Sequence, residues 1–380
     1  TPVEMLVETN YFFALSRYAE RLIAHYEAHP SAVEPASARN EVMSFLRSGV
    51  KDLSISRSTF DWGVKVPWDP SHVVYVWFDA LLNYATAVGL GDTDGPGKEQ
   101  FDATFPADVH LVGKDILRFH AVIWPAMLMA AGLPLPRQVF AHGWLLVGGE
   151  KMSKSRLTGI SPDSIVDHFG SDAFRYYFMR AISFGQDGSF SWEDMSARYN
   201  SELANGLGNL ASRVTAMTNR YFDGVLPPAV DGSAEEAIHD IAAAAAAGAD
   251  AAIDSLDFSS SLASAWTLVE ALNGYLTEQE PWQVAKAMDQ DPAARERVAT
   301  VLATAAEGLR VVAVLLNPVM PKACAALWHM LGADAALGAL GDQRVQTAGQ
   351  WGQLPAGVSL TKGDALFPRL VDEDAAKGQN

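Results

Sequence analysis

Two lysines flanked by hydroxyl groups are the residues best suited to chemistry. They lie at residues 151–155, with the sequence KMSKS, directly after Gly148 and Gly149. Such a loop can close over a polyphosphate and supply charge and hydrogen-bond donors to oxygens whose negative charge grows during displacement. Taken alone, a Lys/Ser pentapeptide is also compatible with a solvated basic loop. Because this loop follows the third strand of a predicted parallel unit, we favour phosphate binding.

Residues 151–155 repeat the signature of class I aminoacyl-tRNA synthetases. Three further segments resemble methionyl-tRNA synthetases: 75–80 (YVWFDA), 113–120 (GKDILRFH) and 141–143 (AHG). The resemblance extends from residues 8–13 to residues 366–369, almost the whole chain. It implies ATP-dependent ligation of methionine to tRNA(Met) through methionyl-adenylate, with ATP and Mg²⁺ as cofactors. A non-catalytic tRNA-binding protein derived from a synthetase, and another amino-acid specificity within class I, are the alternatives.

The resemblance also implies a pocket for the methionine side chain, formed by Trp77, Ala80, Tyr84, Ile116 and His120. Aromatic edges and an imidazole suit a polarisable thioether, which gains about 0.3 to 1.5 kcal/mol per sulfur–aromatic contact. On spacing alone, the better interpretation is that Trp77 and Tyr84 are core aromatics and that His120 is a core histidine with its hydrogen bonds satisfied. Only the resemblance favours the pocket.

Carried over from the family, further residues would contact ATP. Lys154 would stabilise the pyrophosphate leaving group, and Lys151 and Ser153 would shape the loop. The remaining ATP-binding candidates are Asp115, His142 and Gly143.

A second group of polar residues predicts a site for unpaired bases. Asn205, Asn209 and Arg213 recur every four residues, which places them on one helical face. Trp282, after Pro281, offers a stacking surface worth about 1 to 3 kcal/mol per base. In the family, matching positions bind the tRNA anticodon. The alternatives are a polar surface stripe and a buried loop tryptophan.

The pattern of strands and helices that would position these residues predicts an α/β region followed by an all-α region. Apolar runs at 73–78, 109–112 and 138–141 predict strands, and helical patterns at 79–88 and 115–131 separate them. This alternation is typical of a parallel sheet, whose ligands bind beyond the carboxyl ends of the strands, near Gly113 and Gly143. Further helices, typical of a bundle, are predicted at 197–222, 234–255, 258–278, 294–315 and 320–331.

These patterns and the resemblance together predict the second half of a Rossmann-like class I catalytic domain with a helical-bundle anticodon-binding domain. The predicted segments are 1–50 (returning from an inserted region), 51–150 (catalytic), 151–195 (lysine loop and stem contact), 196–335 (anticodon binding) and 336–380 (tail packing back on the body).

Composition narrows the class of protein. The 380 residues carry 28 Lys+Arg and 45 Asp+Glu, a net charge of −17, and one cysteine. We expect a cytoplasmic monomer with no membrane span, no internal disulfide and no metal site among these residues. The acidity is uneven, because residues 148–222 sum to zero whereas residues 223–300 sum to −11. Net charge is therefore a poor guide to nucleic-acid binding here.

Two features of class I methionyl-tRNA synthetases are not found in these residues. None of the nine histidines forms a His-x-Gly-His element, and a single cysteine cannot build the family's zinc knuckle. We expect both to belong to an N-terminal segment before Thr1 that completes the active site, so zinc is expected only with that segment. We also expect the 380 residues alone not to form methionyl-adenylate.

Overall fold

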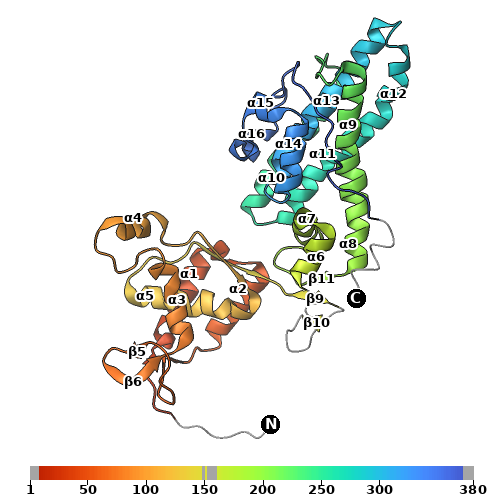
Figure 1. Ribbon diagram of the computed structural model, residues 1–380. Helices are drawn as coiled ribbons and strands as arrows, with labels where there is room; N and C mark the ends of the chain where they lie inside the picture. Colours follow the sequence, from red (N-terminus) through yellow and green to blue (C-terminus); the bar gives the residue numbers. More distant parts are fainter. Residues whose placement is uncertain (1–7, 148–149, 152–160, 371–380) are drawn as a thin grey trace. The chain divides into compact units, whose positions relative to one another are not determined.

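The computed structural model describes residues 8–147, 150–151 and 161–370. The chain divides into two compact units, Thr1–Trp144 and Leu145–Asn380, which follow each other in colour from red to blue in Figure 1. Each unit contains its own core of buried apolar side chains. The finer five-segment division of the chain stays a prediction.

A three-stranded parallel sheet lies in the first unit. β2 (Val33–Glu34), β7 (Val109–Gly113) and β8 (Gln138–His142) pair in the order β2-β8-β7. The register sets Gly113 opposite His142, so β7 and β8 end at the same edge of the sheet. The strands predicted at 109–112 and 138–141 are thus confirmed.

The prediction of a strand at 73–78 is wrong for the second half of this segment and for the strands with which it pairs. β6 (Asp69–Val74) ends earlier and pairs antiparallel with β4 (Ser56–Arg57) and β5 (Lys65–Val66), outside the parallel sheet. The aromatic residues after it begin helix α3 (Val76–Thr86), whose first turn carries Asp79. A carboxylate favours a helix N-terminus, and short apolar runs do not by themselves distinguish strand from helix.

The helical region predicted at 115–131 is irregular. A 3₁₀ turn (Lys114–Ile116) is followed by a π-helix, η4 (Phe119–Ile123), and by α5 (Trp124–Ala131). Gly132 ends α5 at φ 68°, a left-handed conformation that glycine adopts without strain. The other elements of this unit are β1 (Phe12–Phe13), η1 (Leu15–Tyr18), α1 (Ala19–Ala28), η2 (Pro30–Ala32), α2 (Ala36–Arg47), β3 (Leu53–Ser54) and α4 (Gly95–Thr104).

The second unit is a helical bundle, as predicted, and four of its five predicted helices agree with observed ones within two residues at either end. Its helices are α8 (Trp192–Arg198), η6 (Tyr199–Gly208), α9 (Asn209–Phe222), α10 (Ser233–Asp254), α11 (Phe258–Gln279), α12 (Pro281–Val284), η7 (Ala285–Ala287), α13 (Pro292–Leu316) and α14 (Pro321–Met330). Side-chain caps fix two of the starts, because Asp257 accepts from the Ser260 N–H and Asp291 from the Ala293 N–H. The segment predicted as one helix at 197–222 is π-helical over η6.

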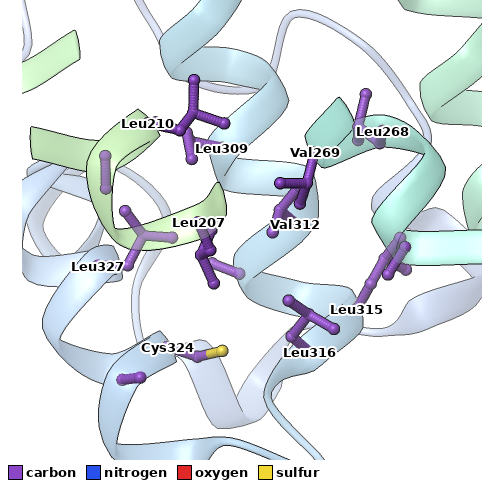
Figure 2. Close-up of a cluster of buried hydrophobic side chains, with 14 of the residues drawn as sticks. Leu207, Leu210, Leu268, Val269, Leu309, Val312, Leu315, Leu316, Cys324 and Leu327 are labelled. Carbon is purple, nitrogen blue, oxygen red and sulfur yellow. The ribbon is translucent and has the colours of Figure 1, made fainter. Parts of the chain in front are cut away.

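Helix α13 forms the centre of this bundle. Its Leu309, Val312 and Leu316 pack among leucines and valines of neighbouring helices, as Figure 2 shows. By length and composition α13 could cross a membrane, but its most apolar stretch lies entirely inside the bundle. Burial on all sides explains its continuous apolar sequence.

The rest of the second unit consists of a small sheet, two helices and the tail. A small sheet joins β10 (Glu150–Lys151), β9 (Leu145–Val147) and β11 (Gly188–Phe190) in that order, with α6 (Pro162–Phe169) and α7 (Ser171–Ala181) between β10 and β11. The tail contains α15 (Ala333–Leu337), η8 (Leu340–Asp342) and α16 (Val345–Ala348). After α16, Leu354, Leu360 and Phe367 are buried in the core of the same unit.

Candidate functional site

Three residues of the predicted methionine pocket lie on one face of α3. Trp77, Ala80 and Tyr84 occupy positions i, i+3 and i+7 of this helix. The expected strand-to-helix turn between Trp77 and Tyr84 is therefore absent, and a single helix positions both. Tyr84 is 37% exposed, which is more than a core aromatic would be.

Helix η4 supplies the facing side chains. Phe119 stacks on Trp77 with ring centroids 4.0 Å apart, and the Tyr84 hydroxyl lies 2.8 Å from Nε2 of His120. Nδ1 of His120 lies 3.0 Å from the carbonyl oxygen of Ile116. The structure thus brings Trp77, Tyr84 and His120 together across α3 and η4, with Ala80 exposed on the same face of α3. Ile116, at the end of the preceding 3₁₀ turn, contributes its backbone carbonyl.

The direction of these hydrogen bonds follows from simple chemistry. A carbonyl oxygen only accepts, so Nδ1 of His120 carries a proton and donates to Ile116. Burial lowers the pKa of His120, which favours the neutral ring. In a neutral ring with a protonated Nδ1, Nε2 accepts, so the Tyr84 hydroxyl donates to it. Burial also raises the pKa of Tyr84, which keeps the phenol protonated.

Two residues near this pair were not among the predicted site residues. His110 of β7 packs edge-on against Tyr84 with ring centroids 4.4 Å apart, and Trp124 of α5 lies 6.1 Å from Tyr84. Burial, with a further contribution from His120, lowers the pKa of His110 to about 4. The available sequence signal was a histidine inside an otherwise apolar strand.

The ATP-binding candidates of the first unit gather where β7 and β8 end. Gly113 pairs with His142, and a Cβ on Gly113 would come within 2.5 Å of the Asp115 carboxylate. His142 donates from Nδ1 to the carbonyl of Gly143 at 2.9 Å. Lys114 lies with its ammonium 4.2 Å from the ring centroid of Trp144. These residues form the edge at which parallel sheets bind ligands.

The lysine segment is described only at its first residue. The backbone of Lys151 pairs with Leu146 in the β10–β9 ladder. Ser153 and Lys154 lie outside the described residues, so their predicted phosphate contacts stay predictions.

A groove of about 810 Å³ runs beside the start of α3 in the first unit. Apolar side chains of β6, the start of α3 and the loop between β4 and β5 line it, together with the charged residues Arg57, Asp61 and Asp79. Trp62 in this groove is 86% exposed, and Phe60, Val64 and Val76 are also exposed. The guanidinium of Arg57 lies 4.6 Å from the ring centroid of Tyr75.

In the second unit, two of the predicted base-binding residues are in contact. The Arg213 guanidinium of α9 lies 4.9 Å from the ring centroid of Trp282, which is half-buried at the start of α12. Glu280, in a left-handed conformation at φ 41°, ends α11 before this tryptophan. Asn209 is exposed on α9, and Asn205 is exposed on the π-helical η6 rather than on a regular α-helix. Within residues 8–147 and 161–370, no group of three His, Cys, Asp or Glu side chains could hold a metal ion.

Two protein-family models match the chain, one after the other. Residues 1–215 match the family described as tRNA synthetases class I (M), and residues 227–380 match the anticodon binding domain of methionyl tRNA ligase.

Individual relatives agree with these matches. Methionine–tRNA ligase of Streptomyces coelicolor is 64% identical over 377 residues, which cover 99% of this chain and 69% of the relative. Methionine–tRNA ligase of Caldanaerobacter subterraneus is 46% identical over 378 residues, which cover 99% of this chain and 57% of the relative. The chain thus spans little more than half to about two thirds of their lengths.

Solved structures show the same likeness. Mycobacterium tuberculosis methionyl-tRNA synthetase in complex with methionyl-adenylate is 41% identical, with a TM-score of 0.90. The match covers 97% of this chain and 70% of that one. The predicted fold class, a class I catalytic region with a helical anticodon-binding domain, is thereby confirmed.

Proposed function

Because this chain belongs to the family of class I methionyl-tRNA synthetases, we propose that it serves the ATP-dependent ligation of methionine to tRNA(Met) through methionyl-adenylate. The observation that carries the proposal is the pairing of α3 with η4. The Trp77–Phe119 stack and the Tyr84–His120 hydrogen bond set aromatic rings and a neutral imidazole side by side. This chemistry suits an uncharged, polarisable thioether.

The reaction has two displacement steps. A carboxylate oxygen of methionine attacks the α-phosphorus of ATP, the bond to the β-phosphate oxygen breaks, and pyrophosphate leaves. A ribose hydroxyl at the tRNA end then attacks the methionyl carbonyl, loses its proton and releases AMP. Both steps depend on positioning and on stabilisation of charge on phosphate oxygens.

Two groups of residues are proposed to bind ATP. In the first unit, Asp115, His142 and Gly143 lie at the carboxyl edge of the parallel sheet, which supports a role in holding the nucleotide. The roles of Lys151, Ser153 and Lys154 at the pyrophosphate rest on the family resemblance. Mg²⁺ is proposed to arrive with ATP, whose phosphate oxygens are its usual ligands.

The second unit is proposed to bind the anticodon of tRNA(Met). Arg213 and Trp282 support this role, because a guanidinium over an indole offers a stacking surface and hydrogen-bond donors for unpaired bases. Asn205 and Asn209 are exposed, so their amides are available for base edges.

An N-terminal segment of the same protein that completes the active site is also part of the proposal. The exposed groove that contains Trp62 supports it, because contiguous apolar surface of this kind usually meets another protein segment. Zinc would come only with such a segment. A cytoplasmic location and a monomeric state likewise remain proposals.

Methionine-dependent ATP–pyrophosphate exchange tests the proposal. The enzyme for the assay is a chimaera in which these residues replace the matching stretch of the Streptomyces coelicolor relative. We expect exchange with methionine to exceed that with leucine or isoleucine by at least 100-fold, on the order of 3 kcal/mol. Failure to prefer methionine would refute the amino-acid assignment.

The 380 residues alone provide the second arm of this test. We expect them to give no exchange above background, whereas robust exchange would refute the need for a completing segment. The alternative function, a tRNA-binding protein without catalysis, predicts that the chimaera is also inactive while the 380 residues still bind tRNA(Met).

A further inference from the structure

Arg220 is an exposed arginine in the last turn of α9, beyond the residues proposed to contact the anticodon bases. It lies seven positions after Arg213, whose guanidinium lies against the ring of Trp282. Seven residues are almost two helical turns, so both side chains leave the same face of α9, about 10 Å apart along its axis. Asn209, four positions before Arg213, is exposed on this face as well. One face of α9 therefore carries a polar stripe that continues past the proposed anticodon site.

The Arg220 guanidinium is held in place although it is exposed. It lies 5.5 Å from the ring centroid of Tyr221. That ring is half-buried, because it packs against the cluster formed by Met288, Val298 and Leu302. An arginine that rests on an anchored ring has less conformational freedom to lose when it binds a ligand.

The charge of Arg220 is not neutralised within the chain. Within the described residues 8–147 and 161–370, no carboxylate forms an ion pair with Arg220, although Asp223 follows three positions later. A cation in the last turn of a helix also interacts favourably with the helix dipole. That contribution needs no ligand, so the dependence of RNA binding on salt separates it from a role in binding.

The spacing of the stripe fits a nucleic-acid strand. Stacked nucleotides rise about 3.4 Å each, so the roughly 10 Å between Arg213 and Arg220 corresponds to about three of them. A strand whose bases meet Asn205, Asn209 and Arg213 would therefore bring its backbone to Arg220 a few nucleotides further on. The planar guanidinium offers N–H donors in a fork that fits two oxygens of one phosphate.

We propose that Arg220 binds a backbone phosphate of the anticodon stem-loop outside the CAU triplet, and so adds affinity for tRNA without reading its sequence. This inference rests on the proposed anticodon-binding function, to which it adds a residue and the chemical group that this residue holds. Contacts to phosphates fix the register of a strand, whereas contacts to base edges carry the sequence preference. Arg220 would thus position the loop, while Arg213 and Trp282 meet the bases.

Binding of RNA hairpins to the 380-residue chain tests this role, with fluorescence anisotropy measured between about 50 and 200 mM salt. One hairpin carries the CAU anticodon, and a second carries a changed triplet on the same stem. For Arg220→Gln we expect the slope of log Kd against log salt to fall by about 0.7 to 0.9, the change for one lost phosphate contact. Affinity should fall about two- to fivefold for both hairpins alike. Arg220→Lys keeps the charge and should keep the slope.

Arg295→Gln is the matched control. Arg295 is also exposed, and its guanidinium lies 5.0 Å from the ring centroid of Phe222, so the contact is of the same kind. Phe222 comes two positions after Arg220, about 200° around α9, so this second pair lies on the opposite side of the helix. We expect Arg295→Gln to leave the slope unchanged. An unchanged slope in Arg220→Gln, or an equal change in both variants, would overturn the proposal.

A series of hairpins with one uncharged methylphosphonate at successive positions identifies the phosphate. At the contacted position, Arg220→Gln should cause no further loss of affinity, whereas additive losses at every position would overturn a direct contact. If the wild-type chain binds both hairpins equally, the anticodon proposal fails, while the salt slope still decides the role of Arg220. If it binds neither hairpin, both proposals fail.

Discussion

Replacement of Arg310 by methionine is expected to destabilise the helical unit strongly. Arg310 on α13 is fully buried and its guanidinium pairs with the Glu307 carboxylate at 2.9 Å. It also donates to the carbonyl oxygens of Ala348 and Gln350, at 2.8 and 3.0 Å, and so ties the tail to α13. Methionine keeps most of the volume but leaves the carboxylate and both carbonyls without this partner.

The expected cost is about 3 to 5 kcal/mol, the range for removing one partner of a buried ion pair. That is a large share of the roughly 5 to 15 kcal/mol that stabilises a domain. Urea unfolding followed by circular dichroism measures it. Arg295→Met on an exposed position of the same helix is the matched control, and should change the free energy of unfolding by less than about 1 kcal/mol.

A double variant separates charge from packing. In Glu307→Gln with Arg310→Met, the unpaired charge is gone, while the amide oxygen still accepts from a backbone N–H of Gln353 or Leu354. We therefore expect the double variant to be more stable than Arg310→Met alone. A cost below about 1 kcal/mol for Arg310→Met, or additive costs in the double variant, would refute the reasoning.

Three further predictions concern the two units separately. The pKa of His110 is about 4 against its usual 6.5, so its protonation costs the first unit about 3 kcal/mol of stability as pH falls from 7 toward 4, because the unfolded chain binds the proton first. Urea titrations at several pH values should show a smaller slope in His110→Phe, with the lowered pKa values of His120 and His25 accounting for a remainder. Trp282→Ala should weaken binding of a hairpin carrying the CAU anticodon about 5- to 150-fold by fluorescence anisotropy, and a similar affinity for both proteins would contradict the stacking role. Trp62→Ser should leave the melting temperature of the isolated 380 residues unchanged but lower that of the chimaera, and equal behaviour in both would contradict burial of the groove by a further segment.

Regular, strongly periodic elements could be predicted from the sequence. The predicted bounds of α10, α11, α13 and α14 differ from the observed ones by at most two residues at either end. Long apolar periods and prolines between helices define such elements locally. The strands β7 and β8 were equally clear, because each is a short apolar run between helical patterns.

Elements that depend on distant partners could not be predicted. β2 has two residues, too few for any periodicity, yet it completes the parallel sheet. The run 73–78 reads as a strand until Asp79 and the antiparallel partners of β6 are known. The spacing of side chains in η4 and η6 is also that of an ordinary helix, so their π-helical hydrogen bonding could not be predicted.

For the candidate site, too, contacts between distant residues could not be predicted from the sequence. Its predicted members came from resemblance, whereas their arrangement came from contacts between residues far apart in the sequence. Tyr84 and His120 are 36 positions apart, and Arg213 meets Trp282 from another helix. His110 was missed because its partner, Tyr84, lies on a different element, and strand periodicity says nothing about that contact.

Charging of tRNA(Met) is the measurement that tests the proposed ligase function most directly. The chimaera is incubated with labelled methionine, ATP, Mg²⁺ and either tRNA(Met) or the same tRNA with a changed anticodon, beside the Streptomyces coelicolor relative as a positive control. We predict methionyl-tRNA formation with the CAU anticodon and a rate at least 100-fold lower with the changed one, on the order of 3 kcal/mol of lost recognition. A chimaera that folds but charges neither tRNA, or charges both equally, would contradict the proposed function.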